Sequence, residues 1–327
     1  MRTATGISPG KLILSGEHSV VKGAPALGLA IDRFVATHVV GAENPPFKQL
    51  DFIKSSIDLR YHMFLKKSLL IAQVIEKPEA LIAYAVAQLR TYFDPNNQNP
   101  GFALSTQTNL PVGCGMGSSA ALILSIHNAL QGAFDFLLPD SAAHELALEA
   151  ENLIHGKSSG LDIALCQKGG MHRFEKGKLT EIPCTGFSAN LIHTGEPESS
   201  TGECVLQAGL YLTPSKVESF ANVTQKMEDA LLKEDAVLLW NSVRENHRLL
   251  CEIGVVPTRV KKMIEAIEAL GGAAKICGAG SVTGENAGVV WVVGNAIEAY
   301  KKAIAEYQAD WMGNTLLCPK GAQICLA

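Results

Sequence analysis

A glycine-rich loop at residues 111–121 constrains the fold and chemistry of this chain more than any other segment. Three glycines alternate, two serines follow, and the apolar run Ala-Ala-Leu-Ile-Leu then predicts a helix over residues 118–134. Glycine has no Cβ, so it adopts positive φ readily and lets a ligand approach the backbone closely. A glycine run that leads into a helix directs backbone N–H groups and the positive helix end at one point. The loop therefore predicts a phosphate-binding site.

The same residues also allow a plainer interpretation. A flexible loop followed by a helix with Ser118 or Ser119 as its cap would have the same sequence features, because glycine-rich turns are common. On the phosphate-binding interpretation, the serine hydroxyls could instead bind a phosphate or a magnesium ion. Other segments of the chain have to decide between the two.

The composition narrows the class of protein. A chain of 327 residues with 47% hydrophobic and 18% charged residues is typical of a globular protein with two domains. Its net charge of −4 argues against a nucleic-acid partner. The N-terminal residues carry no apolar signal segment, and no apolar run is long enough to cross a membrane, so we expect a cytoplasmic protein without a membrane partner. Eight cysteines without C-x-x-C spacing predict reduced thiols and no zinc site.

Strand and helix patterns alternate without strict βαβ order, which favours an α+β fold. A break near residues 183–188 divides the chain into predicted domains at 1–185 and 186–327. Residues 16–31 are expected to form a turn and a short buried segment, and Gly156 to end a helix. The pattern predicts strands over 11–14, 34–40, 102–108, 189–193 and 289–293, and helices over 78–93, 118–134, 141–155, 214–232, 235–252, 258–270 and 296–307.

Two further segments carry chemistry. In residues 9–21, Lys11 opens a short apolar run and the pair Glu17-His18 follows its far end. In residues 151–162, two glycines let the chain turn back, so that the carboxylates of Glu151 and Asp162 can approach each other. If these residues have no role in binding a ligand, they are a surface lysine, a solvated turn, a glutamate in a last helical turn and a turn aspartate.

Common alternatives fail on their spacing. The tripeptide Gly156-Lys157-Ser158 resembles the end of a Walker A loop, but Glu151 stands where the first glycine is required. No histidine follows His144-Glu145 at position 148, so the zinc-protease motif is absent. Neither glycine-rich loop matches G-x-G-x-x-G, which argues against a dinucleotide site.

Taken together, these segments resemble the GHMP family of small-molecule kinases, and within it the mevalonate-kinase branch. Four segments carry the resemblance, at residues 9–21, 111–121, 155–162 (His-Gly-x-x-Ser-Gly-x-Asp) and 275–281, and the likeness runs from residue 9 to about residue 290. The resemblance implies a two-domain α+β GHMP kinase fold. Its N-terminal domain would be like domain 2 of ribosomal protein S5, its C-terminal domain ferredoxin-like, and its active site in the cleft between them.

The resemblance also implies roles for particular residues in ATP-dependent phosphorylation of a small alcohol. Asp162 matches the catalytic base, and Lys11 would neutralise charge on the reacting hydroxyl and γ-phosphate. Ser119 and Glu151 would hold Mg²⁺. Substrate-binding positions would be Glu17, His18 and Thr201, and the ATP phosphates would lie against Gly113, Gly115, Gly117, Ser118, Ser119 and Ala120.

Two departures from the family pattern leave alternatives open. The third glycine motif, residues 275–281, continues into a longer and more polar segment than usual at 281–288. Glu198 stands where the family tends to carry an arginine that would face a substrate carboxylate. The leading substrate is mevalonate. A related kinase acting on phosphomevalonate, homoserine or a sugar, and an inactive binding protein on the same fold, remain alternatives. The expected partner is a small molecule, and a homodimer is compatible with the sequence.

Overall fold

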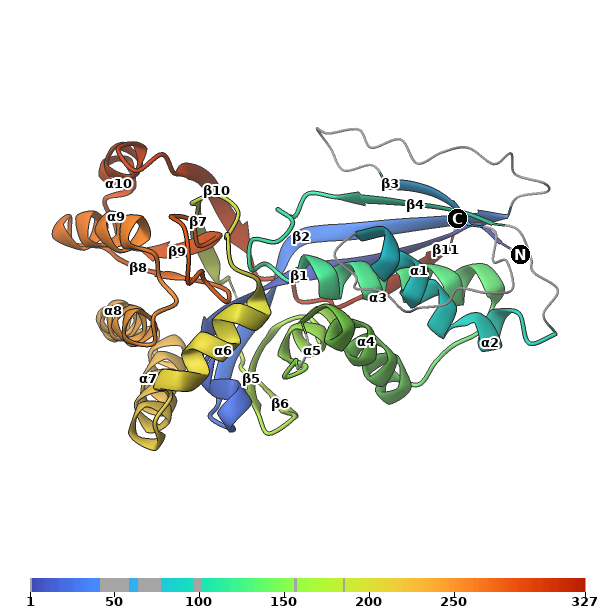
Figure 1. Ribbon diagram of the computed structural model, residues 1–327, viewed down its shortest axis with the longest axis horizontal. Coiled ribbons are helices and arrows are strands. Elements are labelled where there is room, and N and C mark those ends of the chain that lie inside the picture. The colour runs from blue at the N-terminus through green and yellow to red at the C-terminus, as the bar shows by residue number, and fades with distance from the viewer. Residues whose placement is uncertain are drawn as a thin grey trace.

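The computed structural model describes residues 2–41, 59–63, 78–96, 102–155, 158–184 and 186–326. Gly156, the predicted helix end, and most of the segment from 42 to 77 lie outside these described residues. Two β-sheets lie next to each other, and helices cover one side of each (Figure 1). The first sheet carries the glycine loop, and the second carries the third glycine motif.

The first sheet is built around two long antiparallel strands, β1 and β2. Its strand order is β11-β1-β2-β4-β3, and β5 and β6 extend it from β2. The strands are β1 (Ala4–Ser15), β2 (Ala26–Gly41), β3 (Leu59–Met63), β4 (Phe102–Thr108), β5 (Met171–Glu175), β6 (Lys178–Glu181) and β11 (Gln323–Leu326).

A largely buried helix, α3 (Ser118–Phe134), packs against β1 and β2. It is surrounded by α1 (Pro78–Gln88), α4 (Asp140–His155) and α5 (Leu161–Lys168), and the short α2 (Arg90–Phe93) follows α1. Because α3 also contacts α4 and α5, these three helices belong to one layer. This layer supplies two acids of the site, Glu151 and Asp162.

The second sheet has the order β10-β7-β9-β8. Its strands are β7 (Ser188–His193), β8 (Ala273–Ile276), β9 (Val289–Val293) and β10 (Asp310–Leu316). Five helices accompany it, namely α6 (Thr201–Tyr211), α7 (Pro214–Leu232), α8 (Ala236–Glu252), α9 (Thr258–Ala269) and α10 (Ile297–Ala305). Helix α7 packs against α8 and also against β1 and β2, so it joins the two sheets.

One predicted segment differs from the structure. The turn expected within residues 16–31 contains a short 3-10 helix, η1 (Ser19–Lys22), but residues 26–31 are already part of β2. This half of β2 pairs with β1 on one side and β5 on the other and is buried. A strand covered on all sides has a continuous apolar sequence, which hides the period-two alternation of an exposed strand.

The C-terminal strand returns to the first sheet. After β10 completes the second sheet, β11 pairs with β1, so that Ala4 lies opposite Leu326. The division at 185/186 stays a prediction, because the end of the chain contributes to the sheet in which it begins.

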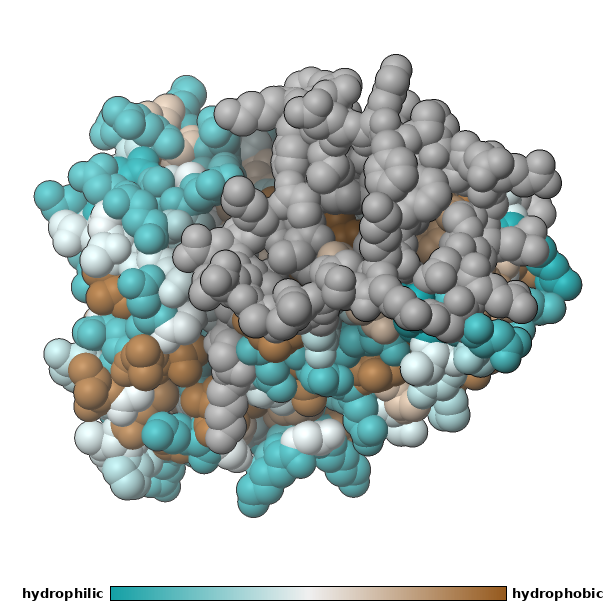
Figure 2. All heavy atoms as spheres, turned by 45° about the vertical axis from the view of Figure 1, so that its right-hand side comes forward, coloured by the Kyte–Doolittle hydropathy of each residue, from teal (hydrophilic) through white to brown (hydrophobic). Residues whose placement is uncertain are grey.

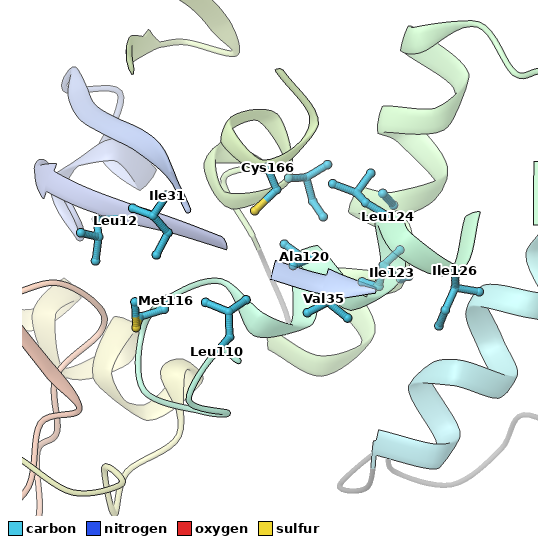
Figure 3. Close-up of a cluster of buried hydrophobic side chains, with 14 of the residues drawn as sticks. Leu12, Ile31, Val35, Leu110, Met116, Ala120, Ile123, Leu124, Ile126 and Cys166 are labelled. Atoms are coloured by element: carbon cyan, nitrogen blue, oxygen red, sulfur yellow. The ribbon is translucent and has the colours of Figure 1, made fainter. Parts of the chain in front are cut away.

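The glycine loop rests directly on β1. A Cβ on Gly10 would lie 2.8 Å from the Met116 carbonyl oxygen and 2.5 Å from a Leu110 methyl carbon. The Lys11 amide donates to the same carbonyl at 2.9 Å. Met116 and Leu110 point into the core beside Leu12 (Figure 3). Loop and strand therefore form one packed unit, which fixes where the loop's backbone amides point.

The surface is mixed in character. On the face in Figure 2, hydrophilic side chains cover much of the described surface, and hydrophobic ones gather mainly towards its lower left.

None of the helices in the described ranges is long and apolar enough to cross a membrane. All eight cysteines lie in the described residues, and none of them forms a disulfide there.

The two departures from the family pattern meet in space. The Ser199 hydroxyl accepts the amides of Val282 and Thr283 at 3.1 and 3.0 Å, and the Ser199 amide donates to Ser281 Oγ at 2.9 Å. Glu198 Oε1 accepts the Glu285 amide at 3.2 Å. The acid at position 198 therefore binds the backbone of the segment that follows the third glycine motif.

We predict that Ser199→Ala loosens this loop. The substitution leaves the amides of Val282 and Thr283 without their acceptor, so hydrogen exchange at both should accelerate and the free energy of unfolding should fall by about 1–3 kcal/mol. Ser219→Ala is the control, because that half-buried serine donates to the Ser215 carbonyl of its own helix. Unchanged exchange at both amides would show that Ser199 does not hold the loop.

Candidate active site

The structure brings Lys11 and Asp162 into direct contact. Lys11 Nζ lies 2.9 Å from Asp162 Oδ2 and donates to the Gly115 carbonyl at 3.0 Å. The lysine side chain is 3% exposed and the aspartate side chain 27% exposed. A Cβ on Gly117 would lie 2.8 Å from Lys11 Cγ, so the glycine loop wraps around the lysine stem. A buried ammonium thus lies between the loop backbone and a carboxylate that solvent still reaches.

The turn between α4 and α5 brings the second acid close. Gly160, with φ of 79°, precedes α5, and Asp162 lies in the first turn of that helix. The Ser158 hydroxyl donates to Glu151 Oε2 at 2.7 Å, and the Ser158 amide donates to Asn152 Oδ1 at 2.7 Å. These bonds fold the turn back onto α4, as the glycine spacing predicted.

Glu151 is almost fully buried next to this pair. Burial raises the pKa of Glu151 well above its usual range and the charge of Asp162 adds to the rise, while the Ser158 hydrogen bond and Lys11 oppose it. Two carboxyl groups therefore share one nearby ammonium, and a cation beside them would favour the charged form of Glu151, which burial disfavours.

Mg²⁺ suits these residues chemically. It prefers hard oxygen ligands and keeps several waters, so two protein ligands are enough. Glu151 offers a buried carboxylate, and Ser119 is the second residue of α3, two positions after the glycine that covers Lys11. In the described part of the chain, no cluster of three or more His, Cys, Asp or Glu side chains could hold a metal.

The glycine loop has the backbone geometry that its sequence predicts. Gly113, Gly115 and Gly117 all have positive φ, at 73°, 87° and 72°. Ser118 accepts the Gly113 amide at 3.4 Å across the loop, and Ala120 is buried. A side chain at any of these glycines would be strained, because L-residues rarely adopt this conformation.

The third glycine motif packs on the glycine loop. A Cβ on Gly278 would lie 2.7 Å from the Gly115 Cα, so the two backbones touch. The Cys114 carbonyl accepts the Val289 amide at 3.1 Å, which adds a bond to the strand that follows this motif. The second sheet therefore also supports the loop, in addition to Lys11's own strand.

Glu17 and His18 lie at the junction of the two sheets. Glu17 forms an ion pair with Lys275 of β8, and both side chains are almost fully buried. His18 Nε2 donates to the Ala279 carbonyl at 3.0 Å. Glu17 Oε2 and His18 Nδ1 are buried, and neither has a hydrogen-bond partner among the residues that the structure describes.

His18 presents an acceptor. Burial lowers the pKa of His18 to about 4, with the Ala279 carbonyl opposing the shift and the charge of Lys275 adding to it. The imidazole is therefore neutral at pH 7, and because Nε2 donates its hydrogen to a carbonyl, Nδ1 carries the lone pair. Together with Glu17 Oε2, this nitrogen can accept hydrogen bonds from hydroxyl groups.

Thr201 lies near the segment that follows the third glycine motif. It is the first residue of α6, directly after Ser200, whose side chain and that of Glu203 form a capping box. The preceding residues Glu198 and Ser199 bind the third-motif loop, so Thr201 starts its helix close to that loop.

Two residues at the site were given no role from the sequence. Ser158 binds Glu151, and its signal was its place between the two glycines of the turn. Lys275 pairs with Glu17 although 258 positions separate them. The position of Lys275 at the start of the third glycine motif could have indicated a role for it, but the sequence around it does not indicate that Glu17 is its partner.

Comparison with known proteins matches both halves of the chain. The family model for the N-terminal domain of GHMP kinases matches residues 80–170, and the model for their C-terminal domain matches residues 227–283. A mevalonate kinase of Thermococcus gammatolerans is 30% identical over 293 residues, which cover 84% of this chain and 85% of the relative.

Solved structures share the fold at low identity. The mevalonate kinase of Methanococcus jannaschii has a TM-score of 0.73 at 19% identity and covers 96% of this chain and 98% of its own. The galactokinase of Lactococcus lactis has a TM-score of 0.74 at 15% identity, with 98% and 95% covered. The predicted two-domain α+β fold is thus confirmed. The sequence relative and the two family models show that this chain belongs to the GHMP kinase family.

Proposed function

We propose that this protein transfers the γ-phosphoryl group of ATP to the primary hydroxyl of mevalonate, which yields 5-phosphomevalonate for isoprenoid synthesis. The observation that carries the proposal is the Lys11–Asp162 pair, held against the glycine loop with Glu151 close by. Phosphoryl transfer needs positioning and charge neutralisation more than covalent chemistry, and this arrangement offers both.

Each residue has a part in the proposed reaction. The amides of residues 113–119 and the start of α3 hold the phosphates of ATP. Asp162 accepts the proton of the attacking hydroxyl, and Lys11 stabilises negative charge on that oxygen and on the γ-phosphoryl group. Ser119 and Glu151 would hold Mg²⁺, which would neutralise charge on the phosphates.

The substrate is inferred from sequence rather than from fold. The fold is as close to a galactokinase as to a mevalonate kinase, whereas the sequence relative at 30% identity is a mevalonate kinase. The acceptors on Glu17 and His18 suit the hydroxyls of a small polyol acid. Glu198 binds the third-motif loop, so it has a structural role that does not require a different substrate.

A coupled assay of ADP release tests this function. The alcohols are mevalonate, phosphomevalonate, homoserine and galactose, each with MgATP. Turnover of mevalonate with a kcat/KM at least about tenfold above the others supports the proposal, since tenfold corresponds to about 1.4 kcal/mol of discrimination. Binding of MgATP without turnover of any alcohol would instead favour an inactive binding protein. A cytoplasmic location and a homodimer stay predictions.

We predict that Asp162→Asn stays folded with lowered stability, since Glu151 still balances the charge of Lys11, and that it loses activity. The amide cannot accept the hydroxyl proton, so kcat should fall by about 10²–10⁴-fold. Asp140→Asn is a matched control, because Asp140 also pairs with a lysine, Lys168, but lies exposed at the start of α4. A near-normal kcat for Asp162→Asn would remove this residue from the mechanism.

We predict that Glu151→Gln raises the Mg²⁺ requirement. The amide keeps a neutral oxygen but removes the charge, so half-saturation should need about tenfold more Mg²⁺, and activity should recover in part at high concentration. Glu149→Gln is the control on the same helix, since its exposed carboxylate bonds to Tyr84. An identical Mg²⁺ dependence in both variants would contradict the proposed metal site.

A further inference from the structure

Lys275 crosses from the second sheet to the first. It lies on β8 with its side chain fully buried, and its ammonium bonds to three acceptors. One acceptor is the Ile276 carbonyl at 2.6 Å, in its own strand. The others are the Ile13 carbonyl at 3.3 Å and Glu17 Oε1, both from β1 or the turn that follows it.

These three bonds satisfy the lysine completely and the glutamate only in part. An ammonium has three hydrogens, and each has an acceptor here. The carboxylate is held through Oε1 alone, while Oε2 is buried without a partner in the described ranges. Because buried polar atoms are normally hydrogen-bonded, this unpartnered oxygen and the unpartnered Nδ1 of the next residue, His18, indicate a place for a ligand's donors.

We infer that Lys275 is a positioning residue for the alcohol subsite: from the second sheet, it holds the Glu17 carboxylate so that Oε2 accepts a substrate hydroxyl. The inference rests on the proposed function, since it takes Glu17 to contact the alcohol. Lys275 itself has no hydrogen left for a ligand, so it acts through Glu17.

The same short segment also aligns this subsite with the phosphate loop. Two residues after β8, Gly278 touches the Gly115 backbone, and the next residue, Ala279, accepts from His18. Gly115 in turn accepts the hydrogen bond of Lys11. Residues 275–279 therefore set where the alcohol acceptors lie relative to the loop that would hold the phosphates.

A buried contact between α7 and the first sheet provides a matched control. The Thr224 hydroxyl of α7 bonds to Ser15 Oγ at 2.7 Å and to the Phe220 carbonyl at 2.9 Å. It links α7 to β1 two residues before Glu17, and its side chain is as buried as that of Lys275. Thr224→Val loosens the junction without touching Glu17.

The first test compares Michaelis constants. In Lys275→Met, the KM for mevalonate should rise about 10–100-fold, as expected for a lost hydrogen bond to a charged group. The KM for ATP and kcat should stay within about threefold of the wild-type values. In Thr224→Val, both KM values should stay within about twofold, although the melting temperature falls. Equal KM values for mevalonate in folded Lys275→Met and wild type would overturn the inference.

A double variant shows whether the lysine acts through the acid. If it does, Glu17→Gln and Lys275→Met/Glu17→Gln should have the same KM for mevalonate within about threefold. If the two KM effects multiply instead, Lys275 does not act through Glu17 and the inference is wrong. The double variant also avoids an unpaired buried carboxylate, so it can be measured even where Lys275→Met does not fold.

The wild-type assay keeps the two hypotheses apart. If the wild-type enzyme phosphorylates no alcohol of the panel, the proposed function fails. If it phosphorylates mevalonate while Lys275→Met keeps the wild-type KM, only the role of Lys275 fails.

Discussion

The contacts of the buried Lys11 ammonium are the interactions on which the rest of the site depends. Its two acceptors, the Gly115 carbonyl and Asp162, come from the glycine loop and from α5, while the lysine belongs to β1. Burying an ammonium is costly unless its hydrogens are bonded and its charge is balanced. The three segments can thus form their native contacts only together, and the phosphate loop and the proposed base are placed by the same charge.

The third glycine motif gives the site its second support. Backbone contact between Gly278 and Gly115 requires that neither residue has a side chain, which explains glycine at both positions. The same segment binds His18 through Ala279 and pairs Lys275 with Glu17. Its lengthened end is held in turn by Ser199 and Glu198. One continuous segment of the second sheet thereby contacts the proposed nucleotide and alcohol positions.

Local signals explain what the sequence could predict. The helix at 118–134, the strand at 102–108 and the helix at 214–232 have the predicted bounds, the last because Thr213 and Pro214 supply a cap and a first-turn proline. The start of β2 was missed because its burial on all sides removes the alternating pattern. The pairing of Lys275 with Glu17 depends on the packing of the two sheets, which no local pattern records. The roles of the site residues stay predictions.

The balance of charge points to where a cation belongs. Glu17 has Lys275 as its partner and Asp162 has Lys11, and both lysines are buried. Among the described residues, Glu151 accepts a hydrogen bond from the Ser158 hydroxyl, and its burial and the nearby charge of Asp162 both disfavour its charged form. Its raised pKa expresses that imbalance. A divalent ion at Glu151 would favour the charged form of this carboxylate and would attract the phosphates of ATP towards Lys11. Among the described acids of the site, Glu151 is thus the one best suited to a metal, since Lys275 and Lys11 pair directly with Glu17 and Asp162.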